Sequence, residues 1–363
     1  MKKQIQMILL SGCLIVGLVG CGNTKEKNAE SLPSLGNMQQ NETEFTLLEL
    51  PDQVEFTSHI LNYSTSLTEC EVCEIEEVKF DEQKVQQLLA PESDLADWAI
   101  EDIPEYDLKI YSFSNGVKSI NVGMDLFYTT ENWSWKSTFG PLSSGSGEGR
   151  HYEWNGATGD LPFCSIEDAV GLVRTVLQSL GYEDIQVLNT YSIDHATMQT
   201  MEEYSLTDKT YQNEMEQGKR PPKKEVWTNA DDGYLFDMRI IVNGLPVLCS
   251  TYILPDDSMV TGGEIFAGYG TTGIEYLELG EIFQITGKSA EKLLSYQQIL
   301  EVLVEKYNNL IVESPTVISD VQLAYYPIIE NNQQKLIPVW AFTEKVGSSS
   351  RYIYINAING KEI

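Results

Sequence analysis

The chain has 363 residues, of which 54 are Asp or Glu and 24 are Lys or Arg, so its formal net charge is −30. Recognition of nucleic acid and adhesion to anionic lipid both need clustered Lys and Arg, so this charge argues against nucleic acid and against lipid binding by charge alone. The hydrophobic fraction of 42% is typical of a globular protein and excludes a disordered, collagen-like or polytopic membrane chain.

The first 21 residues have the pattern of an export signal. Lys2 and Lys3 precede a short apolar run, which ends in Leu18-Val19-Gly20 directly before Cys21. This pattern is typical of a secretory signal peptide, and the run is marginal for a bilayer span, although an uncleaved anchor helix is the alternative. The last four residues resemble the lipobox of bacterial lipoproteins. The resemblance implies a signal peptide at residues 1–20, cleavage before Cys21, and a diacylglycerol carrying fatty acids such as palmitate on its sulfur.

The acidic residues are concentrated near the start of the exported part. Removing residues 1–20 removes two lysines, so the remaining charge is 22 minus 54, or −32. Residues 41–110 hold 19 acidic residues and three lysines. This composition indicates a solvated surface, and a docking face for a basic partner is the alternative. Residues 21–44 are polar and are expected to form a flexible tether.

Residues 45–141 are predicted to form an acidic α+β region. The expected elements are strands at 45–50 and 54–61, a helix at 81–90, a hairpin over 108–128, and a strand through 133–139. Asn115-Gly116 between the two alternating runs is a strong hairpin signal, because both residues tolerate the positive φ angles that a tight turn needs. The Ser- and Gly-rich string at 143–150 predicts a boundary.

Residues 142–290 are predicted to form a second region, whose first element is a well-marked helix. Ser165 is a good N-cap, apolar residues then follow the 3.6-residue period, and Gly181 is a good helix terminator. The expected elements after it are a strand at 185–193, a polar and helical stretch at 194–217, a hairpin turning at Asn243-Gly244, and strands at 260–267 and 274–285.

Residues 291–363 repeat this order. Ser295 and Gln298 form a capping-box pattern before a helix, and strands are expected at 321–329, 336–342 and 352–357. The strings at 244–247 (Gly-Leu-Pro-Val) and 336–339 (Leu-Ile-Pro-Val) indicate an internal duplication with a long insertion in the first copy. We therefore predict an α+β fold in which antiparallel sheets are each packed by a helix.

The closing segment resembles the end of PepSY-like domains. The residues that carry this resemblance are Leu336–Phe342 and Tyr352–Glu362, with a hydrophobic strand, an Asn-Ala pair, a Gly turn and an acid. The wider layout is similar to the YycH/YycI type of envelope regulators and to uncharacterised lipoproteins of Gram-positive bacteria. The resemblance implies two PepSY-like repeats in a non-catalytic module outside the cytoplasm that restrains a partner such as a sensor kinase or a peptidase. A lipid anchor replaces the N-terminal helix of the YycH/YycI proteins here.

Few residues have the spacing of a catalytic or cofactor site. Gly268-Tyr-Gly-Thr-Thr-Gly273 matches a dinucleotide-binding string, but a strand pattern follows where that fold needs a helix, so a glycine-rich loop is expected. His59, His151 and His195 lack metal-ligand spacing and are expected to be surface or structural residues. We expect no nucleotide, metal or other cofactor.

Cys70 and Cys73 form a Cys-x-x-Cys string in a chain that is expected to be exported. A local disulfide, two free thiols, a redox pair and half of a metal site are the alternatives. The acidic residues around both cysteines disfavour a reactive thiolate. A pairing of Cys164 with Cys249 is a further candidate.

Four aromatic residues surround the glycine-rich boundary: Trp133, Trp135, Tyr152 and Trp154. Exposed aromatic side chains stack on sugars or bind peptides, whereas alternation at 133 and 135 also fits the buried face of a strand. The sequence thus favours a lipid-anchored binding or regulatory module for an envelope protein. An envelope hydrolase, an inhibitor of one, and a carbohydrate- or peptide-binding module are the alternatives.

Overall fold

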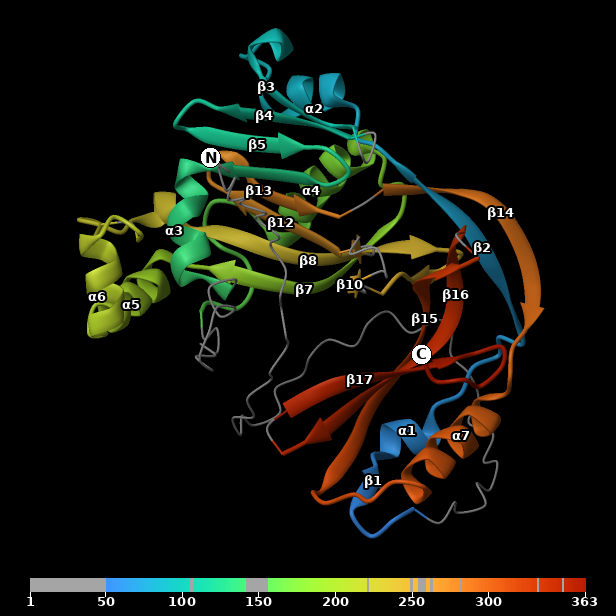
Figure 1. The fold of residues 1–363 in the computed structure, drawn as a ribbon. Coiled ribbons are helices and arrows are strands. Elements are labelled where there is room, and N and C mark those ends of the chain that lie inside the picture. Colours follow the sequence, from blue (N-terminus) through green and yellow to red (C-terminus); the bar gives the residue numbers. More distant parts are fainter. Residues whose placement is uncertain are drawn as a thin grey trace, which may run out of the picture.

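The computed structural model describes residues 50–104, 108–141, 156–220, 222–248, 251–253, 259–261, 264–280, 282–331, 333–347 and 349–363. Two large, mainly antiparallel sheets and the helices packed on them give an α+β fold, as predicted (Figure 1). A small two-stranded sheet, formed by β10 (Thr251–Ile253) and β11 (Met259–Thr261), accompanies them.

The larger sheet has nine strands in the order β3-β4-β5-β6-β13-β12-β8-β7, with the short β9 paired to β8. Its strands are β3 (Ala99–Ile103), β4 (Leu108–Ser114), β5 (Lys118–Val122), β6 (Leu126–Thr130), β7 (Ile185–Ile193), β8 (Gly233–Val242), β9 (Leu245–Pro246), β12 (Glu264–Gly270) and β13 (Gly273–Leu279). All neighbouring strands in this sheet are antiparallel.

The smaller sheet has six strands in the order β1-β15-β16-β2-β14, with β17 also paired to β16. Its strands are β1 (Val54–Phe56), β2 (Glu69–Val78), β14 (Ile282–Lys292), β15 (Thr316–Glu330), β16 (Gln333–Val346) and β17 (Ser349–Asn356). The pairing of β1 with β15 is parallel, whereas the other pairings are antiparallel.

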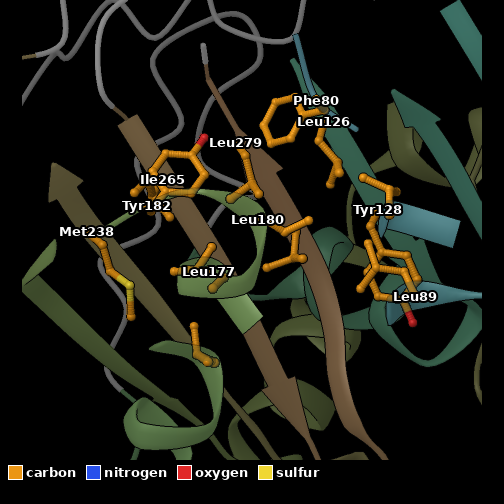
Figure 2. Close-up of a cluster of buried hydrophobic side chains, with 14 of the residues drawn as sticks. Phe80, Leu89, Leu126, Tyr128, Leu177, Leu180, Tyr182, Met238, Ile265 and Leu279 are labelled. Carbon is orange, nitrogen blue, oxygen red and sulfur yellow. The ribbon is translucent and has the colours of Figure 1, made fainter. Parts of the chain in front are cut away.

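Helices cover both sheets through apolar faces. The helices are α1 (Ser58–Asn62), α2 (Glu82–Leu89), α3 (Glu131–Phe139), α4 (Ile166–Leu180), α5 (His195–Ser205), α6 (Lys209–Glu216) and α7 (Tyr296–Asn308), with single 3₁₀ turns η1 (Leu95–Asp97) and η4 (Asn229–Asp231). Figure 2 shows how Leu177 and Leu180 of α4 meet Met238, Ile265 and Leu279 of the nine-stranded sheet. The side chains of α3 and α5 belong to a separate apolar cluster, and those of α7 form the core of the six-stranded sheet.

The helix ends agree with the capping signals in the sequence. The Ser165 side chain accepts a hydrogen bond from the backbone N–H of Asp168, and Gly181 ends α4 with a φ of 114°. Ser295 and Gln298 form the full capping box of α7. These caps satisfy backbone groups that have no partner within the helix, which is why they mark its ends.

The two Asn-Gly turns lie where the sequence predicted them. Asn115 and Gly116 connect β4 to β5, and Asn243 and Gly244 connect β8 to β9. Gly116 has a φ of 82°, while Asn243 and Gly244 have φ values of 48° and 78°. At Gly116, Asn243 and Gly244 the positive φ angle is the physical reason for the residue. Asn115 contributes through its side chain, which accepts the backbone N–H groups of Val117 and Lys118.

The strand predicted at 133–139 is wrong, because this segment is helix α3. Strand β6 ends at Thr130, which adopts extended backbone angles and becomes the N-cap of the helix. The buried residues are Trp133, Lys136 and Phe139, at the three-residue spacing of a helix face. Because Lys136 is polar, the sequence does not show this helical spacing as an apolar pattern. The spacing that it does show is the two-residue interval between Trp133 and Trp135, which is typical of a strand. The strand predicted at 54–61 is likewise only β1, followed by helix α1.

The strands of residues 45–141 do not form a sheet of their own. Strands β3 to β6 complete the nine-stranded sheet, whereas β1 and β2 belong to the six-stranded sheet with strands of the C-terminal region. The boundaries expected at 141 and 290 therefore do not separate the sheets. Pairing with strands from later in the chain gives β2 and β6 a neighbour on each side.

Strands β2 and β14 belong to the six-stranded sheet and extend to the nine-stranded sheet (Figure 1). They pair with each other over Glu69–Val78 and Ile282–Lys292. The ends of the two strands near Val78 and Ile282 contribute to the core of the nine-stranded sheet, while Cys73 pairs with Leu336 of β16. The loop after β9 adds another link, because the N–H of Leu248 donates to the carbonyl of Tyr325.

The helices α4 and α7 are each followed by three antiparallel strands whose middle strand pairs with both others. These strands are β7-β8-β9 after α4 and β15-β16-β17 after α7. The residues between β7 and β8, 194–232, contain α5, α6 and η4, and we call this segment the insertion. The duplication itself stays a prediction.

Candidate functional site

The helix α3 places its buried side chains against strands β12 and β13. The Trp133 ring is 1% exposed and stacks on Tyr276 with ring centroids 5.3 Å apart. Phe139, on the same helix face, lies in the same apolar cluster. Trp133 is therefore a core residue, and its ring has no open face for a ligand.

Lys136 forms an ion pair with Glu275 of β13 beneath this helix. The distance between Lys136 Nζ and Glu275 Oε2 is 2.7 Å, and the two side chains are 1% and 0% exposed. The Thr272 hydroxyl donates to the other carboxylate oxygen at 2.9 Å. Removing two charges from water is costly unless their geometry and hydrogen bonds compensate, so this pair is the most unusual polar feature of the described chain.

Three glycines provide the space for this arrangement. A Cβ atom at Gly268 would lie 2.5 Å from the Trp133 ring, one at Gly270 would lie 2.2 Å from a carboxylate oxygen of Glu275, and one at Gly233 would lie 2.8 Å from Lys136 Cε. The Gly-x-Gly-x-x-Gly string is thus the end of β12, a two-residue turn and the start of β13. Gly268 and Gly270 of this string make room for side chains of the protein itself, whereas Gly273 has a positive φ of 108° after the turn. The predicted glycine-rich loop is therefore a tight hairpin, and only Thr271 and Thr272 lie outside the strands.

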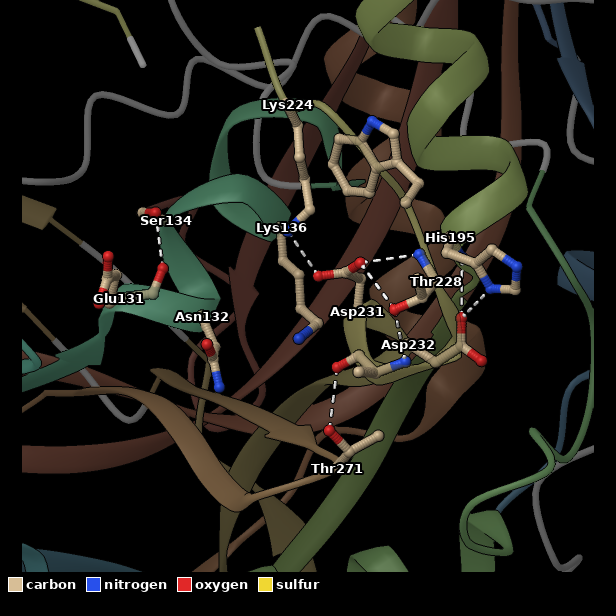
Figure 3. A network of polar contacts seen from close by, with 12 residues as sticks. Glu131, Asn132, Ser134, Lys136, His195, Lys224, Thr228, Asp231, Asp232 and Thr271 are labelled. Atoms are coloured by element: carbon tan, nitrogen blue, oxygen red, sulfur yellow. Dashed lines mark hydrogen bonds and ion pairs between the residues drawn. The ribbon is translucent and has the colours of Figure 1, made fainter. Parts of the chain in front are cut away.

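A surface of aromatic and cationic residues lies near Lys136. Figure 3 labels one of its residues, Lys224, together with Asp231 and Lys136. Lys224 Nζ lies 5.6 Å from the centroid of Trp135 and 5.1 Å from that of Trp227, and it forms an ion pair with Asp231 at 2.7 Å. Arg220 lies over the ring of Tyr211 in the same way. We call Trp135, Tyr211, Arg220, Lys224 and Trp227 the tryptophan–lysine surface.

A buried glutamate fixes this surface from below. Glu202 of α5 is 1% exposed and accepts hydrogen bonds from the backbone N–H of Lys224 at 2.7 Å and from Trp227 Nε1 at 2.8 Å. Because both oxygens are occupied, the segment before β8 is held in one position on the helices of the insertion. The Trp227 ring and the backbone at Lys224 are therefore fixed by contacts within the protein.

His195, at the start of α5, pairs with a buried carboxylate. Its Nδ1 lies 2.7 Å from Asp232 Oδ1, and the same oxygen accepts the backbone N–H of His195 at 2.8 Å. The neighbouring Asp194 caps α5 by accepting the N–H of Thr197. These contacts fix the N-terminus of the helix on η4, which agrees with the structural role expected for this histidine.

Cys70 and Cys73 are free thiols on strand β2. Three residues of extended strand span about 10 Å, and cysteines whose Cα atoms are more than about 7 Å apart cannot be bridged without backbone movement. This geometry argues against the local disulfide. Cys70 Sγ lies 3.3 Å from the Tyr325 hydroxyl, and burial raises the pKa of the Cys73 thiol, which disfavours the reactive thiolate.

Several predicted site residues lie outside the described residues. They are Cys21, Tyr152, Trp154 and, for the second disulfide candidate, Cys249. The structure therefore brings Trp135 into the candidate surface, buries Trp133, and leaves the proposed roles of the others as predictions. Within the described ranges, no three His, Cys, Asp or Glu side chains are grouped as a metal site, and no helix has the length and apolar character needed to cross a membrane.

A small hollow lies between the end of β2, helix α2 and strands β4 and β5. It is lined by Lys79, Phe80, Glu82, Lys109, Tyr111, Val122 and Gly123. Glycoside hydrolysis in most families needs two carboxylates facing each other, and this hollow holds one. It does not provide the site that the hydrolase alternative needs.

The sequence did not point to Lys136, Glu202, Lys224, Trp227 or Glu275. These residues are distant in the chain, and their pairing depends on how α3 and the insertion fold onto the nine-stranded sheet. The one local signal was Lys136 itself, which lies between Trp133 and Phe139 on the apolar face of what is now seen to be a helix.

Comparison with known proteins shows a likeness of fold. No protein-family model matches the chain, and no curated protein matches it. Among solved structures, the chain is similar to an uncharacterized protein from Eubacterium rectale ATCC 33656, with a TM-score of 0.58 and 15% sequence identity. The match covers 86% of this chain and 91% of that one, so almost the whole architecture occurs in another protein.

Proposed function

We propose that this protein is a lipid-anchored module on the outer face of the cell membrane that binds an envelope protein and has no chemistry of its own. The lipobox-like string at Cys21 supports the location. The resemblance of the closing segment to PepSY-like domains supports a binding or regulatory role.

The observation that carries the binding role is the tryptophan–lysine surface. Tryptophan, tyrosine and arginine are the residue types that dominate the binding energy of protein interfaces. Here the Trp227 side chain is partly buried and held by Glu202, which also accepts the backbone N–H of Lys224, so little conformational entropy is lost at these residues when a partner binds. Val226, next to Trp227, is 66% exposed and offers an apolar side chain that a partner can contact.

The proposal is tested by photo-crosslinking in membranes of the producing cell. A photo-crosslinking amino acid replaces Val226 in the full chain, and the matched control carries it at Ile311, which is 92% exposed and follows helix α7 in the other part of the molecule. We expect one discrete protein adduct from position 226 and none from position 311. Trp135→Ala should reduce the adduct about fivefold or more, because truncation of a hot-spot residue costs more than about 1 kcal/mol.

Two outcomes would contradict the proposal. One is an equal pattern of adducts from positions 226 and 311, because this would indicate random collision in the envelope. The other is turnover of cell-wall material by the purified full chain, because this would assign chemistry to a protein that we propose has none.

A further inference from the structure

The Lys136–Glu275 pair has too few hydrogen bonds for two buried ions. An ammonium group has three N–H donors, and within the described part of the chain Lys136 Nζ has one acceptor, Glu275 Oε2. The carboxylate receives one further hydrogen bond, from Thr272. Trp133 lies under the ammonium with its ring centroid 5.9 Å away, which compensates only in part.

The surroundings of the pair exclude water. Glu275 is 0% exposed, and Gly233 and Gly270 pack so closely that a methyl group at either position would overlap Lys136 or the carboxylate. Burial, together with the nearby charge of Glu275, raises the pKa of Tyr128 to about 12. This neighbour therefore indicates an environment in which charged groups are poorly stabilised.

We propose that Lys136 and Glu275 join in a covalent amide bond once the protein has folded. One proton moves from the ammonium to Oε2, and the resulting amine attacks Cδ of Glu275. The C–N bond forms, the second proton moves from nitrogen to the same oxygen, and the Cδ–Oε2 bond breaks as water leaves. Atoms and electrons balance without an oxidant or a further reactant.

The hydrogen bonds of the site suit an amide better than an ion pair. A secondary amide has one donor and one carbonyl acceptor, and Thr272 already donates to the oxygen that would become the carbonyl. Asn132 Nδ2 lies 3.5 Å from the Thr272 hydroxyl and orients it. Thr272 is thus a positioning residue that polarises the carboxyl group. Because the fold already holds the amine against the carboxyl group, the reaction does not pay the translational and rotational entropy of bringing two molecules together.

The protein contains an exposed pair that serves as an internal control. Lys335 Nζ and Glu330 Oε2 are 2.8 Å apart, close to the 2.7 Å of the buried pair, but their side chains are 20% and 58% exposed. Water stabilises these two ions and so disfavours the neutral amine and carboxylic acid that condensation needs. The exposed pair should therefore stay ionic in the same molecules.

The test is a tryptic digest of the reduced, purified full chain, analysed by mass spectrometry. Trypsin cuts after free lysine, so unmodified protein yields peptides 119–136, 137–150 and 240–288. We expect those peptides to be lost and replaced by one branched peptide joining 119–150 to 240–288, lighter by one water than the sum of its parts. Cleavage after Lys335 should remain complete.

Two variants sharpen the test. Lys136→Met should abolish the branched peptide, and Thr272→Val should slow its appearance after refolding without changing cleavage at Lys335. If Lys136→Met does not fold, the wild-type digest still decides. Full recovery of the linear peptides 119–136 and 240–288 from folded wild-type protein would overturn the proposal.

Discussion

Single glycines decide whether the buried pair and the Trp133 ring fit between α3 and the sheet. Gly268 faces the ring, Gly270 faces the Glu275 carboxylate, and Gly233 faces the Lys136 stem. None of the three has a positive φ angle, so the backbone would accept another residue. It is the neighbouring side chains that exclude a Cβ atom here, and overpacking of this kind forces strain on a dense core.

We predict that Gly268→Ala destabilises the protein by roughly 1–3 kcal/mol, because a buried tryptophan cannot move away from the added methyl group. The measurement is urea denaturation followed by circular dichroism. The matched control is Gly171→Ala on α4, where a Cβ atom meets nothing within 4 Å. The control should be stabilised by roughly 0.5–1 kcal/mol, because alanine is the better helix former. Equal stability of the Gly268 variant and the wild type would show that the ring packs elsewhere.

At the scale of elements, one buried carboxylate connects α7 to two strands. Glu344 of β16 accepts a hydrogen bond from the Tyr307 hydroxyl of α7 at 2.6 Å and one from Arg351 of β17. Burial alone would raise the pKa of Glu344, but these hydrogen bonds and the charge of Arg351 outweigh it and lower the pKa below the ordinary value of 4.5. A carboxylate held in this way links the stability of the helix to pH.

We predict that Glu344→Gln is less stable than the wild type by roughly 1–3 kcal/mol near neutral pH, because hydrogen bonds to a charged group are lost. A lowered pKa in the folded state stabilises the protein fully above the ordinary pKa, and this contribution is lost as the pH falls through the lowered value. The difference between variant and wild type should therefore shrink below pH 4.5. Urea denaturation at a series of pH values measures it.

The control for this experiment is Glu301→Gln, an exposed position on helix α7, the helix that carries Tyr307. It should change stability little at any pH, since surface substitutions are usually within about 0.5 kcal/mol. A difference between wild type and Glu344→Gln that stays constant, or grows, on acidification would contradict the assignment.

Helices and turns that carry capping or turn residues were predictable from the sequence, whereas the pairing of the strands was not. Ser165, Ser295 and Asn115-Gly116 mark their elements because caps and turns satisfy backbone groups within a few residues. The position of β2 between β16 and β14 has no such local signal, since its partners lie more than two hundred residues away. The prediction for α3 failed for a related reason. Lys136 interrupts the apolar pattern of the helix in the sequence, and its burial depends on the contact with Glu275 on a distant strand.

At the scale of the whole molecule, the Tyr325 hydroxyl connects the two sheets. Tyr325 lies on β15, receives a hydrogen bond from Asn243 in the β8–β9 turn at 3.1 Å, and donates one to the carbonyl of Glu71 on β2 at 2.8 Å. Its side chain is fully buried. Together with the long strands β2 and β14, this contact indicates that the two sheets unfold as one cooperative unit.

We predict that Tyr325→Phe lowers the free energy of unfolding by about 1–3 kcal/mol, because the buried partners lose their hydrogen bonds. Hydrogen exchange followed by mass spectrometry should show faster exchange in β12 and β13 as well as in β15 and β16. Tyr352→Phe is the matched control, since this tyrosine is 61% exposed and its variant should exchange like the wild type. Faster exchange confined to the six-stranded sheet would show that the sheets unfold separately.

The position of β1 and β2 also constrains the order in which the chain folds. Both strands come early in the sequence, yet their partners β15 and β16 follow more than two hundred residues later. Until residues 316–346 have emerged, the early strands have open edges and cannot complete their sheet. A fold with such high contact order should form slowly and only after β16 has been synthesised, so a truncation that removes β16 and β17 would leave an aggregation-prone chain rather than a smaller stable domain.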